Sequence, residues 1–447
     1  MHNQTKLVLN LKIRVLEHFN FIKTPNGKNI LKNIGWLILD KLIKLSSGLF
    51  LGVLIARYLG PNNFGLLNYA TAFAGLMGAL ISLGLDSIVI KELVKEPEKA
   101  HLILGSSFAL KLAASIIGVI LNLIIIWLLN PENNVTIFLV VVSSMGYIFQ
   151  SINVIDYYFQ SKTQLKYTLI AQNLAFFIIL IFRIYLLISK SSVVRFAIAT
   201  LIENAISSLF LIFLFKKYAG FSIFNWKFSK KVSKKLLIES FPLMLASIAS
   251  TINMRVDQVM LGTMLNKKEV GIFAAAVRIS EIWFLVPAFL GMTIYPSIIL
   301  ARETDYSEYR KKVHKIVFIM STIVFPFALI VTFFSEFIVK LLYGESFVGA
   351  SQILSIHIWS GVPYVAAFAY GQVFYAESLT KLTSYTAFYT VAVNLTLNYF
   401  LIPRFGAVGA AYTSMISAIS AFVLSMVLLN KHSKIFSTKL DFNYEKK

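Results

Sequence analysis

The sequence contains no cysteine and has few charged residues for its length. Without cysteine, this chain of 447 residues has no disulfide, thiolate metal site or cysteine nucleophile. The six histidines are scattered, with neither an HExxH motif nor a paired spacing, so no metal site or metal cofactor is expected. Charged residues make up only 14% of the chain, compared with about 25% in soluble domains. Too few polar side chains remain to cover a water-soluble globule of this size.

Hydrophobic residues account for 57% of the chain, and the mean hydropathy is +0.73. Apolar runs of roughly 20 residues, the length needed to cross the hydrocarbon core, repeat along most of the sequence. We therefore predict an all-α integral membrane protein with twelve transmembrane helices. The predicted spans are 34–59, 64–90, 103–129, 137–160, 167–188, 195–215, 236–263, 270–300, 314–341, 351–376, 382–402 and 407–430.

A polar interval at 216–235, with seven lysines, divides these spans into two sets of six. The segment 59–66, after the first span, is similar to 265–272, after the seventh. This repeat predicts two six-helix bundles related by a pseudo-two-fold axis along the membrane normal. The predicted regions are a cytoplasmic or interfacial segment (1–33), an N-terminal bundle (34–215), a basic cytoplasmic linker (216–235), a C-terminal bundle (236–430) and a cytoplasmic tail (431–447).

The formal net charge of +21 arises from lysines and arginines that lie mostly between the apolar runs. This distribution follows the positive-inside rule and does not favour nucleic-acid binding. Loops and tails on the side of the N-terminus carry 29 of the basic residues, and those on the opposite side carry 7. Both termini are therefore predicted to be cytoplasmic. The first thirty residues lack a signal-peptide pattern, so the first span is expected to remain uncleaved. For 5–22, an interfacial helix and an unstructured basic tail both remain open.

Several charges fall inside the predicted spans, where each costs about 2.5 to 3.5 kcal/mol at a helix centre on insertion scales. Asp40 and Lys44 are four residues apart, and Arg278 and Glu281 three apart, so each pair shares one helix face. Local ion pairing would lower the insertion cost of either pair alone. Because the pairs occur in early spans of both halves, a shared polar cavity is the favoured interpretation.

Other charged residues in or near the spans are interpreted as structural. Lys111 is expected to extend its charged end toward the membrane interface, whereas for Arg57, at the end of the first span, this role and another one both remain open. Arg183 and Glu203 are expected to pair across neighbouring helices. None of these residues is assigned to a binding site.

The order of several short motifs resembles that of Wzx-type polysaccharide flippases, over about residues 30–430. The segment Val270–Glu281 matches best, and the other matching segments are Ala56–Gly65, Leu83–Asp86, Arg255–Gly262 and Tyr343–Phe347. The resemblance implies the fold of the multidrug/oligosaccharidyl-lipid/polysaccharide exporter superfamily, with two six-helix bundles around a central cavity. It also implies a location in the bacterial inner membrane. The implied activity is transfer of undecaprenyl-pyrophosphate-linked oligosaccharides across that membrane for O-antigen, capsule or exopolysaccharide synthesis.

A pyrophosphate headgroup is anionic, and cations in a cavity of low dielectric attract it strongly. The candidate substrate-binding residues are Lys41, Lys44, Arg255 and Arg278. The candidate residues for ion coupling or for pairing with these cations are Asp40, Asp257 and Glu281. Expected partners are the lipid-linked oligosaccharide, membrane lipid, a coupling proton or sodium ion, and a polysaccharide polymerase. Transport is expected to proceed by alternating access, in which one bundle moves against the other.

The main alternative is an ion-coupled multidrug or metabolite antiporter of the same superfamily. A site for organic cations would carry net negative charge, whereas the candidate residues are mixed to basic. A lipid II flippase would share a basic cavity, but the motifs resemble the polysaccharide group more closely. A membrane enzyme would need a polar loop with clustered carboxylates, and the longest polar interval is lysine-rich instead. A scaffold without transport activity would give the charges in the spans no role.

Overall fold

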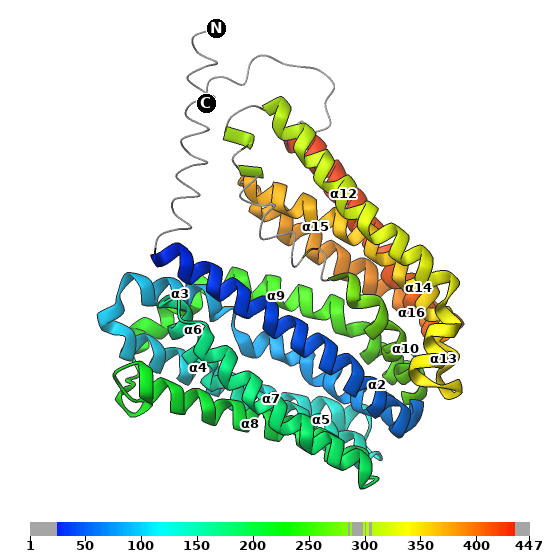
Figure 1. Cartoon of the computed structure of the whole chain (residues 1–447), viewed down its shortest axis with the longest axis horizontal. Helices are drawn as coiled ribbons and strands as arrows, with labels where there is room; N and C mark the ends of the chain where they lie inside the picture. Colours follow the sequence, from blue (N-terminus) through cyan, green and yellow to red (C-terminus); the bar gives the residue numbers. More distant parts are fainter. Residues whose placement is uncertain (1–24, 285–286, 288–297, 300, 304–305, 434–447) are drawn as a thin grey trace. The chain divides into compact units, whose positions relative to one another are not determined.

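The described part of the chain is built from helices joined by short turns (Figure 1). The computed structural model describes residues 25–284, 287, 298–299, 301–303 and 306–433, and the side chains of 25–46, 49 and 283–284 lie outside this description. The helices are α2 (Pro25–Ser82), α3 (Leu85–Lys95), α4 (Ala100–Leu129), α5 (Asn134–Gln150), α6 (Val154–Ser161), α7 (Lys166–Ile188), α8 (Val193–Tyr218), α9 (Lys230–Met264), α10 (Lys267–Ser280), α12 (Tyr306–Phe333), α13 (Ser335–Tyr343), α14 (Ala350–His357), α15 (Gly361–Ala376) and α16 (Thr380–Ser433). The all-α fold class is confirmed.

Nine helical runs in the described residues are long and apolar enough to cross a membrane. The chain is thus a multi-pass membrane protein. The predicted spans 103–129, 167–188 and 195–215 coincide with α4, α7 and α8 except for a few terminal residues. The count of twelve spans and their division into two bundles remain predictions.

Several predicted spans are interrupted in the structure, and 64–90 and 314–341 are two of them. The span 64–90 is interrupted between α2 and α3, where Leu83 and Gly84 have φ values of 55° and 62°. A residue in this left-handed region ends a helix, and the apolar run conceals the break because Leu83 is itself apolar. The predicted span 314–341 is likewise divided, since α12 ends at Phe333 and α13 begins two residues later.

The two longest helical runs each consist of two helices that meet at a glycine with non-helical backbone angles. Gly60 in α2 has φ 69° and ψ 172°, and Gly406 in α16 has φ 60° and ψ −142°. Glycine adopts positive φ without the steric cost that a Cβ would add. Both bends fall between spans that the sequence separates, at 59–64 and at 402–407.

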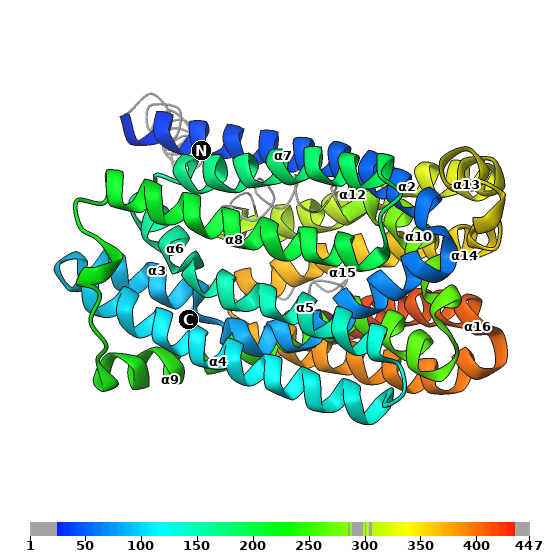
Figure 2. The ribbon, with the colours of Figure 1, turned by 90° about the horizontal axis from the view of Figure 1, so that it is seen from below.

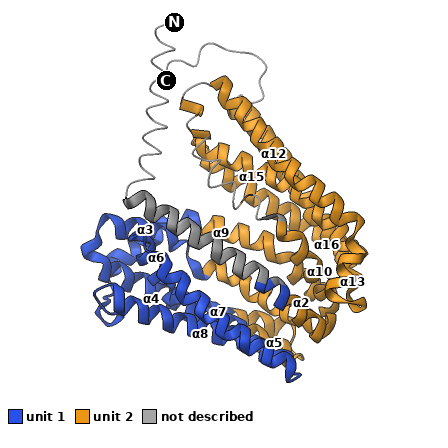
Figure 3. Cartoon of the chain, in the orientation of Figure 1, with its two compact units in different colours: residues 1–51, 81–121, 142–243 blue, residues 52–80, 122–141, 244–447 orange. Residues whose placement is uncertain are grey.

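The chain forms two compact units, which Figure 3 colours separately. Unit 1 comprises residues 1–51, 81–121 and 142–243, and unit 2 comprises residues 52–80, 122–141 and 244–447. Within unit 1, α7 and α8 lie side by side (Figures 1 and 2). Within unit 2, α15 packs against α12 and α16. The domain boundaries expected from the sequence remain a prediction.

The two similar segments that follow the first and seventh predicted spans pack against each other in unit 2. A Cβ built on Gly65 would lie 1.6 Å from the carbonyl oxygen of Lys267, and one built on Gly271 would lie 1.9 Å from that of Pro61. Pro61 corresponds to Lys267 in the two segments, and Gly65 corresponds to Gly271. The contact is therefore reciprocal, and it needs glycine at both positions because two backbones meet there.

Candidate functional site

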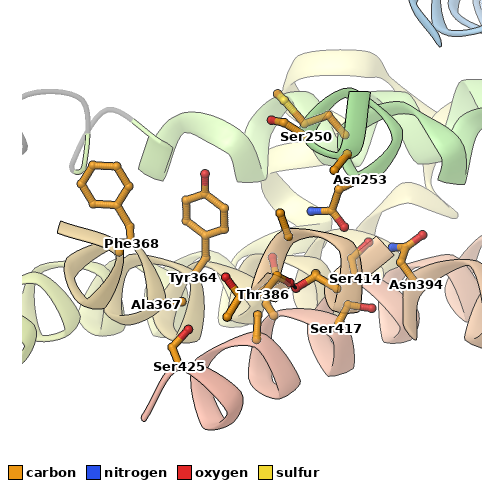
Figure 4. A pocket seen from close by; sticks show the side chains of 18 of the residues that line it. Ser250, Asn253, Tyr364, Ala367, Phe368, Thr386, Asn394, Ser414, Ser417 and Ser425 are labelled. Atoms are coloured by element: carbon orange, nitrogen blue, oxygen red, sulfur yellow. Dashed lines mark hydrogen bonds between the residues drawn. The ribbon is translucent and has the colours of Figure 1, made fainter. Parts of the chain in front are cut away.

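Unit 2 contains a cavity of about 410 Å³ between α9, α10, α14, α15 and α16, lined by both polar and apolar side chains. Hydroxyl and amide side chains supply most of its polar surface, together with aromatic rings from α15 (Figure 4). Figure 4 labels among its lining residues Ser250, Asn253, Tyr364, Phe368, Thr386, Asn394, Ser414, Ser417 and Ser425.

The polar wall on α16 follows from the spacing of its residues. Thr386, Thr390, Asn394 and Asn398 recur every four residues, which places them on one face of the helix. Other faces of the same helix expose large apolar side chains such as Tyr399. This stripe was not predicted, although its four-residue period is visible in the sequence.

Asp257 on α9 is the charged residue most deeply placed in this site, with 6% of its surface exposed. Its Oδ1 accepts a hydrogen bond from Asn398 Nδ2 at 2.6 Å, and its Oδ2 accepts one from Ser414 Oγ at 2.8 Å. Asn398 Nδ2 also donates to Asn394 Oδ1 at 2.9 Å, while Asn398 Oδ1 is buried and has no hydrogen-bond partner among the described residues. Neutral donors thus hold a buried carboxylate close to amide oxygens. This group can take a proton or a small cation.

Glu281, just after α10, lines the same cavity. Its carboxyl lies within electrostatic range of Arg255, Arg278 and Asp257. Arg255 and Arg278 are both exposed, and the Arg278 guanidinium lies 5.8 Å from the centre of the Phe64 ring. The structure therefore brings four of the seven candidate residues into one neighbourhood of unit 2.

The other three candidate residues lie on α2. Asp40, Lys41 and Lys44 belong to its helical backbone, but their side chains fall outside the described residues. Their assigned roles remain predictions.

Among the described lining residues, the formally charged side chains are Asp257 and Glu281. Arg255 and Arg278 lie near Glu281 but do not line this cavity. His357, which does line it, forms a 2.7 Å hydrogen bond with the Ser280 hydroxyl. The described lining is thus neutral to negative, and the predicted cationic cavity remains a prediction.

Of the charges interpreted as structural, Arg183 and Glu203 form the expected ion pair, with Nη2 and Oε2 2.8 Å apart. Arg57 is exposed and donates a hydrogen bond to the Leu341 carbonyl oxygen. The expectation for Lys111 is wrong. Only 7% of its surface is exposed, and its Nζ bonds a tyrosine inside unit 1, because that buried partner replaces water.

Comparison with known proteins places this architecture among transporters. The chain is 22% identical to the capsular polysaccharide biosynthesis protein CapF of Staphylococcus aureus, over 88% of this chain and 98% of that protein. It is also 22% identical to a putative O-antigen transporter of Shigella flexneri, over 91% and 99% of the two chains.

Solved structures share the fold. The lipid II flippase MurJ in an inward closed conformation matches with a TM-score of 0.73 and 17% identity, over 89% of this chain and 87% of that one. An inward-facing multidrug resistance MATE family transporter matches with a TM-score of 0.71 and 16% identity, over 90% and 99%.

Family models agree with these similarities. The MatE model matches residues 242–400. The model described as polysaccharide biosynthesis protein matches residues 30–302, which is more than half of the chain. The resemblance to Wzx-type flippases is confirmed, and the chain belongs to the polysaccharide biosynthesis protein family.

Proposed function

We propose that this protein moves an undecaprenyl-pyrophosphate-linked oligosaccharide across the bacterial inner membrane for the synthesis of a surface polysaccharide. The observation that carries the proposal is the whole-length similarity to two relatives, one named a capsular polysaccharide biosynthesis protein and the other a putative O-antigen transporter. Both termini would be cytoplasmic, as the distribution of lysine and arginine predicts. A polysaccharide polymerase would act on the transferred product.

In this proposal, Lys41, Lys44, Arg255 and Arg278 bind the pyrophosphate headgroup. A guanidinium offers two parallel donors to phosphate oxygens, and an ammonium offers a compact charge. The proximity of Arg255 and Arg278 to Glu281 supports a shared role. The carboxylate offsets their charge when the site is empty, and an arriving pyrophosphate replaces it as their partner.

Asp257 is the proposed binding site of the coupling proton or sodium ion. A proton would neutralise its buried carboxylate, and a sodium ion would use that carboxylate together with the amide oxygens of Asn394 and Asn398. The support is local: these side chains are buried and already in contact with one another. Ion binding would then shift the balance between inward-open and outward-open states.

The cavity lining supports the alternative function, an antiporter, in one specific respect. Its described charges are two carboxylates, which would attract an organic cation, and the MatE model matches this part of the chain. Hydroxyl and amide groups beside aromatic rings also suit the hydroxyls of a sugar. A host strain that lacks its own polysaccharide flippase distinguishes the two functions, because only the flippase restores surface polymer.

Arg278→Ala and Lys44→Ala should each lower surface polysaccharide about tenfold or more in such a strain. The physical reason is the loss of a charge-assisted hydrogen bond, which costs about 1.5 to 3 kcal/mol. Polymer on the cell surface and protein in the membrane fraction are measured together. Arg195→Ala removes the same charge from the first turn of α8 and should leave polymer unchanged. Normal polymer from both variants would reject the assigned roles.

Glu281→Gln should weaken the dependence of transport on pH while preserving the shape of the side chain. The carboxyl exchanges a proton and the amide does not. Transport of the lipid-linked oligosaccharide into proteoliposomes, measured across a pH series, gives the profile. A profile identical to that of the wild type would remove Glu281 from the coupling scheme.

A further inference from the structure

The connection between α8 and α9, residues 219–229, is fixed against α4 in unit 1. The backbone N–H of Lys227 donates to the carbonyl oxygen of His101 at 3.1 Å, and that of Ser229 donates to a serine hydroxyl of α4 at 3.0 Å. A Cβ built on Gly105 would lie 2.5 Å from the carbonyl oxygen of Lys227, so the two backbones are in direct contact. The connection therefore presents a defined surface.

Its aromatic side chains point in two directions. The ring of Trp226 lies 5.8 Å from that of Phe215 on α8, and the ring of Phe221 lies 5.1 Å from it, so these rings face the protein. In contrast, Phe224 is 91% exposed and Phe228 is 62% exposed. Phe224 is the most exposed large hydrophobic side chain in the described part of the chain. Because apolar surface in water is unfavourable, two such rings on a fixed connection indicate an apolar partner.

Lysines flank these two exposed rings in the sequence. The interval 216–235 contains seven lysines and no acidic residue. Five of the lysines are exposed and form no ion pair with any acidic side chain that the structure describes: Lys216, Lys227, Lys230, Lys231 and Lys234. The partner is therefore expected to be anionic as well as apolar.

The neighbouring helices indicate where this surface lies relative to a bilayer. On α8, Phe213 is 61% exposed and stands about one helical turn before Lys216. On α9, Ile238 is 64% exposed and stands about one turn after Lys234. Exposed apolar residues that give way to lysines and aromatic rings are typical of the membrane–water interface. Both helices thus place the connection at the level of the lipid headgroups.

We propose that Phe224, Phe228 and these five lysines form a binding surface for anionic phospholipids, here called the linker surface. The two rings insert among the upper parts of the acyl chains, and the ammonium groups contact the lipid phosphates. Since α4 already holds the backbone in place, little conformational freedom is lost on binding. The linker surface anchors this end of unit 1 to an anionic leaflet, and it does not depend on which substrate the protein carries.

A fluorophore beside the linker surface tests the proposal. The chain has no cysteine, so Asn225→Cys provides a single attachment point that keeps both exposed rings. The labelled full chain is placed in nanodiscs of phosphatidylcholine and phosphatidylglycerol, without any lipid-linked oligosaccharide. A nitroxide quencher is carried by one of the two lipids at a time, at equal amounts. Quenching should be at least about twofold stronger when phosphatidylglycerol carries the nitroxide, and about 1 M salt should weaken this preference by screening.

Ile181→Cys provides the matched control position. Ile181 is a 67% exposed apolar residue on α7, and a fluorophore there should be quenched equally by both lipids. Changing all five lysines to glutamine should remove the preference at Asn225→Cys, whereas changing them to arginine should preserve it. Equal quenching by both lipids at Asn225→Cys, or a preference that survives the glutamine changes, would overturn the proposal. Quenching by neither lipid would overturn it as well, because the linker surface would then lie outside the bilayer.

Discussion

Asp257→Asn should abolish the acceleration of transport by an ion gradient while leaving the protein folded. The asparagine oxygen can still accept from Asn398 or from Ser414, and the Ser414 hydroxyl can turn to accept from the new amide. The packing around the site is therefore retained. The negative charge that would hold a sodium ion, and the group that would hold a proton, are both lost. A coupling free energy of the usual size corresponds to a rate loss of about 5- to 150-fold.

The measurement is transport of the lipid-linked oligosaccharide into proteoliposomes with and without an imposed proton or sodium gradient. Glu239→Gln provides the control. It removes a carboxylate from the same helix, α9, where Glu239 pairs with the partly exposed Lys91. That variant should respond to the gradient as the wild type does. A full response in Asp257→Asn would exclude this carboxylate as the coupling site.

The helices of this protein could largely be predicted because apolar runs and polar turns determine both length and position in a membrane chain. The predicted spans that correspond to α4, α7 and α8 are uninterrupted and bounded by polar residues, so their ends could be predicted from the sequence. Interruptions of a helix inside an apolar run could not be predicted from the sequence. Leu83 adopts a left-handed backbone conformation that its residue type gives no reason to expect.

The candidate site was predictable where its residues are charged. Arg255, Asp257, Arg278 and Glu281 stand out because charge is costly in an apolar span, and the structure gathers them in unit 2. The neutral partners were not predicted, because an asparagine or serine costs little free energy in a membrane helix and is common there. Asp257 and Asn398 are 141 residues apart in the chain, and no local pattern joins them. Lys111 was misjudged for the same reason, because its partner lies on a different helix.

The similar segments 59–66 and 265–272 are the subject of a second prediction with a large effect on stability. Gly65→Ala and Gly271→Ala should each push these two segments apart. A new Cβ would lie 1.6 or 1.9 Å from a backbone carbonyl oxygen, which cannot move aside as a flexible side chain can. Overpacking usually costs about 1 to 3 kcal/mol, and both variants should also lose surface polysaccharide. Thermal unfolding of the purified protein measures the stability loss. Gly48→Ala, before the Gly60 bend in α2, would place its Cβ within 4 Å of no described atom and should leave stability unchanged or slightly raised.

Because the contact is reciprocal, the double variant provides a further test. Once Gly65→Ala has pushed the Lys267 carbonyl away, the two segments are already apart, and Gly271→Ala should add little. The combined stability loss should therefore be clearly smaller than the sum of the single losses, as for other residues in direct contact. Additive losses would mean that the two glycines act in separate contacts. Equal single effects with a non-additive double variant would instead show that segments 59–66 and 265–272 form one shared contact, to which both glycines belong.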